Sequence, residues 1–339
     1  KMNIFLILIA ILNFSIFFFI KKLIVFYGTY DLPDKARKFH KTKTSTIGGL
    51  IFFLNLIFLL FYISINFKLE LIMLFENERQ FYLFFIISSA FFLMGYLDDK
   101  HNLSANLKIT FLSLFIIIIL FLDNNLLISE LNFSFSGTIY YMDRLKYIFT
   151  IFCFIAFINA FNLFDGINSQ IGSYVLFILT IFFLKDLNIF ILITLFYPLI
   201  VFFILNSKGK IFLGNAGSYL LSFIIAYIFI KSYNISNNIY ADEIFFVMLF
   251  PGLDMTRLFF LRIKDKKNPF SPDRNHFHHL LLENFNHNIT LTIIVLMFVA
   301  PYAIFKFCGP HLSLFLTVAC YLIVIYFLKL RKNFRKKTF

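Results

Sequence analysis

Charged residues are scarce in this chain of 339 residues: Asp, Glu, Lys and Arg make up 14%, whereas 60% of the residues are hydrophobic and 21% aromatic. A soluble domain carries about 25% charged residues. The apolar residues also form uninterrupted runs instead of one face of an amphipathic helix, which excludes a water-soluble globular domain. The composition therefore predicts an all-α polytopic membrane protein.

Cysteine is also rare. Cys153, Cys308 and Cys320 lie within or beside apolar runs at no metal-ligand spacing, so they provide no disulfide framework. Acidic residues number 18 against 31 Lys and Arg, which gives a net charge of +13. The basic residues occur in short loops between apolar runs, where membrane topology explains them better than nucleic-acid binding. We expect no nucleic-acid partner.

Eleven apolar runs are candidates for membrane spans, since about 17 to 25 residues cross the bilayer core. They cover 3–27, 47–65, 81–97, 107–122, 147–163, 171–184, 188–205, 213–230, 244–261, 289–306 and 311–328, and the sixth is short. No small-residue cleavage site follows the first apolar stretch, where Lys21 and Lys22 stand instead, so we expect a retained span and not a signal peptide. We expect one integral membrane domain over 1–339.

The distribution of Lys and Arg predicts the orientation. With eleven spans, one side collects 22 of the 31 basic residues and the other only eight. The positive-inside rule makes the richer side cytoplasmic, with the N-terminus outside and the C-terminus inside. In the longest loop of the other side, 123–146, residues 132–141 alternate around Gly137 like a small hairpin.

Five polar clusters fall on the predicted cytoplasmic side, although the orientation rests on Lys and Arg alone. Ionisable groups at membrane depth are functional candidates by default. The first cluster is a loop followed by the glycine pair Gly48–Gly49, and it contains Asp31, Arg37, Lys38 and His40. Basic groups beside glycines suit a phosphate, but for any single lysine a solvated loop at the lipid surface is an equal alternative.

The second and third clusters contain carboxylates. Asp98 and Asp99, in GYLDDK, point about 100° apart on a helix, so one can face a site while the other orients it; the alternative is a pair of interfacial charges. Asn159, Asn162 and Asp165 follow one another at i, i+3 and i+6 and form one polar stripe. The amides could simply bond to neighbouring helices, whereas a carboxylate there favours a cation.

The fourth cluster is the stretch FLGNAGS at the start of the eighth span, with Gly214 and Asn215. A glycine-rich helix N-terminus offers backbone N–H groups to an anion, although glycine also allows close helix packing. The fifth, in the longest inner loop, includes Arg274, His276, His278 and His279. Zinc is conceivable there, but a guanidinium and imidazoles without cysteine favour contacts to phosphate and uridine.

The segments GYLDDK, NAFNLFDG and DRNHFHH resemble, in this order, the motifs of the polyprenyl-phosphate N-acetylhexosamine-1-phosphate transferases, the WecA/MraY superfamily. The histidine spacing is similar to the WecA type. Three departures stand out: Asn215 replaces the usual Asp of GDxGS, DGINSQ replaces DGLDGL, and Ser45, Thr46 and Ile47 replace the usual proline context before Gly48. The first departure bears on metal binding, because an amide oxygen can coordinate but carries no charge.

The resemblance implies transfer of N-acetylhexosamine 1-phosphate from a UDP-N-acetylhexosamine to polyprenyl phosphate, such as undecaprenyl phosphate, with release of UMP. It also implies Mg²⁺ as cofactor, with Mn²⁺ as a substitute, a bacterial inner membrane, and a cell-surface glycan such as O-antigen as the product pathway. A homodimer is left open. A lipid-linked-glycan transporter and a member impaired by Asn215 are the alternatives.

The resemblance also assigns roles to residues. The expected catalytic residues are Asp98, Asp99 and Asp165, and the expected metal ligands are Asp165, Asn162 and Asn215. The expected substrate contacts are Lys38, Asn159, Asn162, Gly214, Arg274, His276, His278 and His279.

Overall fold

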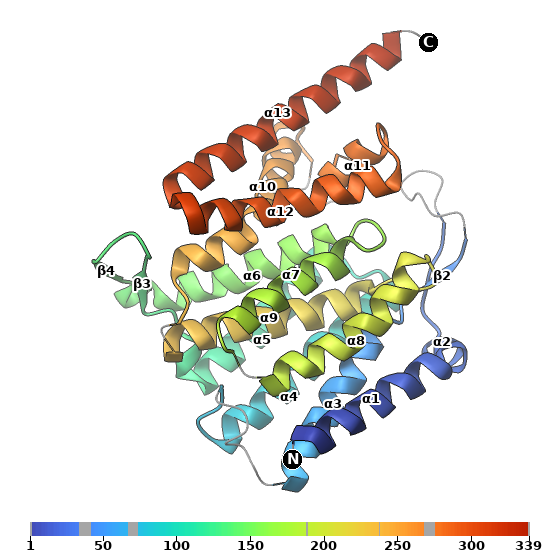
Figure 1. Ribbon diagram of the computed structural model, residues 1–339, viewed down its shortest axis with the longest axis vertical. Helices are drawn as coiled ribbons and strands as arrows, with labels where there is room; N and C mark the ends of the chain where they lie inside the picture. The colour runs from blue at the N-terminus through green and yellow to red at the C-terminus, as the bar shows by residue number, and fades with distance from the viewer. Residues whose placement is uncertain are drawn as a thin grey trace. The chain divides into compact units, whose positions relative to one another are not determined.

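The computed structural model describes residues 2–33, 42–66, 74–187, 189–236, 238–267 and 275–337, and it is predominantly helical over them (Figure 1). The chain divides into two compact units. Unit 1 combines Lys1–Glu130 with Tyr141–Ile239, and unit 2 combines Leu131–Tyr140 with Tyr240–Phe339.

Nine helices in the described part of the chain are long and apolar enough to cross a membrane. Those of unit 1 are α3 (Gly48–Asn66), α4 (Glu78–His101), α5 (Ala105–Leu122), α6 (Lys146–Phe164), α8 (Ile189–Ser207) and α9 (Gly214–Ser236). Those of unit 2 are α10 (Ala241–Lys264), α12 (His287–Cys308) and α13 (Pro310–Lys337). Each contains or closely matches a predicted apolar run, so the protein is an all-α, multi-pass membrane protein.

The two remaining runs differ from a simple span. The first was expected to be continuous over 3–27, but it forms α1 (Met2–Phe18) and α2 (Ile20–Tyr27), bent by 71°. The bend precedes Lys21 and Lys22, whose charges are costly inside hydrocarbon, so a straight continuation across lipid is unfavourable. The sixth run forms α7 (Gln170–Leu184), whose 15 residues fall short of a bilayer core about 30 Å thick.

Short elements connect the helices. The strands β1 (Tyr30–Asp31) and β2 (Thr44–Ser45) pair antiparallel. The predicted hairpin is confirmed, because β3 (Glu130–Asn132) and β4 (Ile139–Tyr141) form a two-stranded sheet. The helical turns η2 (Asn124–Leu126), η3 (Asp143–Leu145) and α11 (Phe277–Leu282) complete the described elements.

Helix α9 forms the centre of unit 1 and contacts α3, α4 and α6 (Figure 1). Its span is fully buried. Glycine makes this contact possible: a Cβ on Gly49 would lie 2.3 Å from the Gly217 nitrogen, and one on Gly95 would lie 2.4 Å from the Asn215 oxygen. Because no larger residue fits, the ends of α3 and α4 lie directly against the start of α9.

Aromatic side chains hold unit 2 together. Phe246 of α10 stacks on Phe305 of α12 with ring centroids 4.7 Å apart. Phe277 of α11 packs against Phe250 at 5.1 Å and Tyr321 of α13 at 5.5 Å. The short helix α11 is therefore anchored by its first residue, which places the histidines on either side of it.

Candidate active site

Asp98 joins three helices of unit 1 through a nearly inaccessible carboxylate, 1% exposed. Its Oδ1 accepts a hydrogen bond from the Leu103 N–H at 3.0 Å, just beyond the end of α4. Its Oδ2 lies 2.8 Å from Lys108 Nζ on α5 and accepts from the Tyr219 hydroxyl on α9 at 3.3 Å. Since a buried carboxylate needs such partners, Asp98 is held in one orientation.

Asp99 caps helix α9. Its Oδ1 accepts from the Asn215 N–H at 2.9 Å and its Oδ2 from the Ala216 N–H at 3.2 Å, and the Asn215 side chain also hydrogen-bonds to it. Gly214 has a φ of +74°, and a Cβ there would lie 2.6 Å from Asp99 Oδ2. Two of the N–H groups expected for a substrate anion, those of Asn215 and Ala216, are thus bonded to Asp99, while the substrate contact at Gly214 stays a prediction.

The glycine pair that begins α3, Gly48–Gly49, forms backbone hydrogen bonds instead of the expected phosphate contacts. The N–H groups of Gly48 and Gly49 donate to the Phe212 and Leu213 carbonyls, both at 2.9 Å. The Phe212 N–H donates to the Ser45 carbonyl at 2.8 Å. These bonds fasten the segment before α9 to α3, so in this structure the two N–H groups serve the backbone and not a phosphate.

The polar stripe of α6 ends beside Asp99. Asn159 and Asn162 are half-buried, and Asn159 Nδ2 donates to the Ile155 carbonyl of the same helix at 2.8 Å. Asp165, also half-buried, follows the last residue of α6. Burial, reinforced by the Asp99 carboxylate, raises the pKa of Asp165 to about 7. The two carboxylates therefore lie within electrostatic reach of each other.

The turn after Asp165 is strained and firmly held. Ser169 has a φ of +68°, a conformation that is costly for a residue with a side chain. Its N–H donates to Asn206 Oδ1 at 2.7 Å, while Asn206 Nδ2 donates to the Ile211 carbonyl at 2.8 Å. Asn206 thus connects the turn after α6 to the segment before α9.

The charges of this cluster are unequal. Asp98, Asp99 and Asp165 are opposed, among their described contacts, by one lysine side chain, Lys108. In the described part of the chain no three His, Cys, Asp or Glu side chains converge as ligands of one metal ion. The surplus carboxylates and nearby amides fit Mg²⁺, which uses one or two carboxylates and completes its shell with water and substrate phosphates.

Unit 2 contains the histidine cluster and a buried acid that the sequence analysis missed. Asp254 of α10 accepts at Oδ1 from Arg257 Nη2 at 2.7 Å and from the Tyr321 hydroxyl at 2.8 Å. Its Oδ2 lies 3.5 Å from His276 Nδ1 and accepts from the Phe277 N–H at 3.3 Å. The signal was available, because a carboxylate and a guanidinium three residues apart interrupt an apolar run.

The three imidazoles contact one another. His276 and His278 stack with centroids 5.2 Å apart and planes at 16°, and His278 meets His279 edge-on at 4.2 Å. Burial and the two neighbouring histidines lower the pKa of His278 well below its usual range. His278 is accordingly neutral and packs within the cluster.

The structure brings Asp98, Asp99, Asp165, Gly214 and Asn215 together within unit 1, and it brings His276, His278 and His279 together within unit 2. Asn159 and Asn162 lie on the α6 face that leads to Asp165. The expected substrate contacts Lys38 and Arg274 lie outside the described residues.

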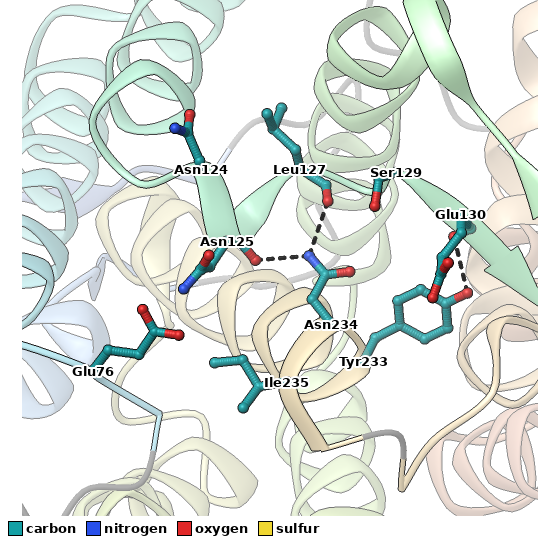
Figure 2. Close-up of a pocket in the computed structure, with 9 residues that line it drawn as sticks. All are labelled: Glu76, Asn124, Asn125, Leu127, Ser129, Glu130, Tyr233, Asn234 and Ile235. Carbon is teal, nitrogen blue, oxygen red and sulfur yellow. Dashed lines mark hydrogen bonds between the residues drawn. The ribbon is translucent and has the colours of Figure 1, made fainter.

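The end of α9, the 124–130 segment and Glu76 line a pocket that the sequence analysis did not predict. Figure 2 shows Asn234 donating to the carbonyls of Asn125 and Leu127, at 2.7 and 3.1 Å, and Tyr233 donating to the Glu130 carbonyl at 3.0 Å. The pocket has a volume of about 410 Å³. Its polar groups therefore tie the 124–130 loop to the end of α9.

Comparison with known proteins gives consistent results. The family model for glycosyl transferase family 4 matches residues 81–233, which include Asp98, Asp99, Asp165 and Asn215. A relative from Escherichia coli O157:H7 is 26% identical over 277 residues, covering 78% of this chain and 72% of its own length. One from Thermotoga maritima is 28% identical over 269 residues, covering 78% and 77%.

Both relatives are named undecaprenyl-phosphate alpha-N-acetylglucosaminyl 1-phosphate transferase. The matched segment contains the end of α4, the end of α6 and the start of α9, where the carboxylates lie. Residues 81–233 are thus similar to glycosyl transferase family 4, and 78% of the chain is similar to these two transferases.

Proposed function

We propose that this protein transfers N-acetylhexosamine 1-phosphate from a UDP-sugar to polyprenyl phosphate, undecaprenyl phosphate in particular, and releases UMP. The observation that carries the proposal is the surplus of carboxylates at the meeting point of α4, α6 and α9. It lies within the segment that matches the transferase family, and the named relatives act on undecaprenyl phosphate. A lipid-linked surface glycan such as O-antigen is the proposed product pathway.

The proposed metal ligands are Asp165, Asn162 and Asn215. Mg²⁺, or Mn²⁺ in its place, would neutralise the donor pyrophosphate and make UMP a better leaving group. Asn215 has a second role in this proposal, because it also hydrogen-bonds to Asp99 and so keeps that carboxylate beside Asp165.

In the proposed reaction, an oxygen of the lipid phosphate attacks the phosphorus that bears the sugar. A new P–O bond forms, the bond from that phosphorus to the UMP oxygen breaks, and UMP leaves with the electron pair. Asp98, oriented by Lys108 and Tyr219, positions the lipid phosphate or takes its proton if it arrives protonated. Lys38, Arg274 and the histidines hold the nucleotide phosphates.

The proposed setting is the bacterial inner membrane, with the N-terminus outside and the C-terminus inside. The eleven crossings of this proposal require the bent α1–α2 pair and the short α7 each to cross the bilayer. The basic residues support it, with 22 of 31 on one side. Single cysteines introduced beside Asp98, Asp165 and His276 should all react with a membrane-impermeant thiol reagent from the cytoplasmic side. Labelling of these segments from opposite sides would end the proposal of a shared site.

The activity test uses the full-length protein in detergent or nanodiscs. UMP release should require UDP-sugar, polyprenyl phosphate and Mg²⁺ together, and a panel of UDP-sugars would identify the N-acetylhexosamine. The Asp98→Asn, Asp165→Asn double variant is the control. Robust turnover by this variant would refute the assigned roles.

An impaired enzyme is the second candidate, and Asn215 in place of the usual Asp is the observation that favours it. Asn215→Asp decides between the two. A large gain in rate would show that the wild type is impaired, whereas an unchanged robust rate would show that the amide suffices. A loss of rate would indicate that a third carboxylate beside Asp99 disturbs the site.

A further inference from the structure

The buried Asp254 of unit 2 is linked to the histidine cluster by direct contacts. Asp254 is 7% exposed and His276 6% exposed. The 3.5 Å separation of Asp254 Oδ2 and His276 Nδ1 is slightly longer than a hydrogen bond. Such contacts are often long in a ligand-free site and tighten when the ligand binds.

The other contacts of Asp254 fix the start of α11. The same Oδ2 accepts from the Phe277 N–H at 3.3 Å. Arg257, bound to Oδ1, also donates from Nη2 to the Asn275 carbonyl at 2.6 Å. Arg257 therefore holds Asn275, the residue before His276, and Asp254 holds Phe277, the residue after it.

Stability alone gives little reason for this network. A buried ion pair is often no more stabilising than apolar side chains of similar volume, because both charges must leave water. Unit 2 already anchors α11 by the packing of Phe277 between Phe250 and Tyr321. The network therefore serves mainly to fix the orientation of the His276 imidazole.

We infer that Asp254 is a positioning residue that orients His276 through Nδ1 and thereby aims its Nε2 at a phosphate of the nucleotide-sugar. A phosphate oxygen accepts hydrogen bonds, and an imidazole that is held at Nδ1 has its Nε2 left to face the ligand in a fixed direction. Arg257 and Tyr321 act one step further away, because they hold the Oδ1 of Asp254. This inference rests on the proposed function and names the group that donates to the donor substrate.

The first experiment is a double-mutant cycle in the full-length protein. Asp254→Asn keeps the size of the side chain and should raise the KM for UDP-sugar about 10- to 100-fold, as is usual for partners that orient a functional histidine. The KM for polyprenyl phosphate should stay near that of the wild type. The melting temperature should fall, because Arg257 is left buried without its ion-pair partner. In the His276→Ala background, Asp254→Asn should have no further effect, because the acid acts through that imidazole.

Tyr321→Phe is the matched variant. It removes one partner of Oδ1 and leaves Oδ2 and His276 in place, so the KM for UDP-sugar should rise only about 2- to 10-fold. Additive effects of Asp254→Asn and His276→Ala would overturn the inference. An equal rise of both KM values would also overturn it, since an effect shared by both substrates indicates a structural role.

A second measurement does not depend on turnover. Diethyl pyrocarbonate should label His276 slowly in the wild type and several-fold faster in Asp254→Asn, as measured by mass spectrometry of the 275–283 region, while Tyr321→Phe should resemble the wild type. Unchanged labelling in Asp254→Asn would refute the contact. A wild type that releases no UMP from any UDP-sugar would instead refute the proposed function, and the labelling would still decide whether Asp254 holds His276.

Discussion

The two ends of the α4–α9 pair contain similar residue types and use them differently. At one end, the carboxylates of Asp98, Asp99 and Asp165 exceed the one contacting lysine, Lys108. At the other end, Lys231 lies 2.8 and 2.9 Å from the two oxygens of Asp123, and both residues are buried, at 0% and 2% exposure. Among these described contacts, carboxylates exceed basic groups at the first end, here called the unbalanced end, whereas the buried pair at the second, here called the neutral end, is balanced.

Further hydrogen bonds stabilise the buried pair at the neutral end. Lys231 Nζ donates to Gln80 Oε1 at 3.1 Å, and the Tyr227 hydroxyl donates to Asp123 at 3.2 Å. Lys231 and Asp123 thus each have partners within the protein, which is typical of a structural network. Among the described residues, the carboxylates at the unbalanced end exceed their basic partners, so the chemistry is expected there.

This difference also bears on the transporter alternative. A transporter for lipid-linked glycans needs polar groups that serve the cargo near both membrane faces. The buried polar residues around Lys231 are satisfied by one another, and Figure 2 shows the neighbouring side chains of Tyr233 and Asn234 bonded to the loop backbone. The structure therefore favours a function located at one end.

The largest expected effect concerns the neutral end. Lys231→Met leaves Asp123 buried without its partner and should lower the free energy of unfolding by about 3–5 kcal/mol. Thermal unfolding in detergent would measure it. The double variant Asp123→Leu, Lys231→Met should recover most of the loss, and Lys208→Met, at an exposed lysine, should change stability by less than about 0.5 kcal/mol. If Lys231→Met were as stable as the wild type, the Lys231–Asp123 pair would not be a structural network and the contrast between the two ends would be lost.

At the unbalanced end, Asp165→Asn should reduce kcat/KM by more than about 100-fold, since partners of metal ligands alone contribute 10 to 100-fold. Its melting temperature should equal or exceed that of the wild type, because the substitution removes repulsion from Asp99. UMP release and thermal unfolding, measured on the same preparation, test both statements. A strongly destabilised but active variant would reverse the roles assigned to the two ends.

Gly95→Ala tests the close contact between α4 and the start of α9 at the unbalanced end. The added Cβ would lie 2.4 Å from the Asn215 backbone oxygen, so α4 and α9 must move apart. The hydrogen bonds by which Asp99 caps α9 must then lengthen. The expected cost is about 1–3 kcal/mol, together with lower activity. Gly252→Ala is the matched control, because a Cβ on Gly252 of α10 meets nothing within 4 Å. The control should be neutral or slightly stabilising.

The smallest expected effect is a pH dependence. Because the pKa of Asp165 is raised to about 7, its proton stabilises the metal-free folded state, and this contribution is lost as pH rises through about 7. Mg²⁺ must displace the proton, so the apparent Mg²⁺ affinity should fall about tenfold per pH unit below 7. Mg²⁺ should accordingly raise the melting temperature more at pH 8 than at pH 6. Equal shifts at both pH values would place the metal elsewhere.

Several features of the protein were accessible from local sequence. An apolar run needs about 20 residues to cross lipid, so the helices could be read from composition and length. The hairpin around Gly137 followed from alternation, and the carboxylates of α4 and α6 were found because charge is costly in such runs. These inferences require no knowledge of which helix lies beside which.

Other features depend on partners distant along the chain. Asp99 and Asn215 are 116 residues apart, so the capping of α9 by Asp99 could not be read from either motif. Lys231 was counted among the loop charges, yet it is buried beside Asp123, 108 residues away. Asp254 and Tyr321 are 67 residues apart, and neither belongs to a recognisable motif.

The lipid environment, the helices and the available chemical groups follow from residues close together in the chain, so they can be predicted from the sequence. Which charges are neutralised and which are left over depends on how distant segments pack. The reason is physical: the energy of a buried charge depends on the groups that surround it in space, and packing between glycines and aromatic rings selects those groups.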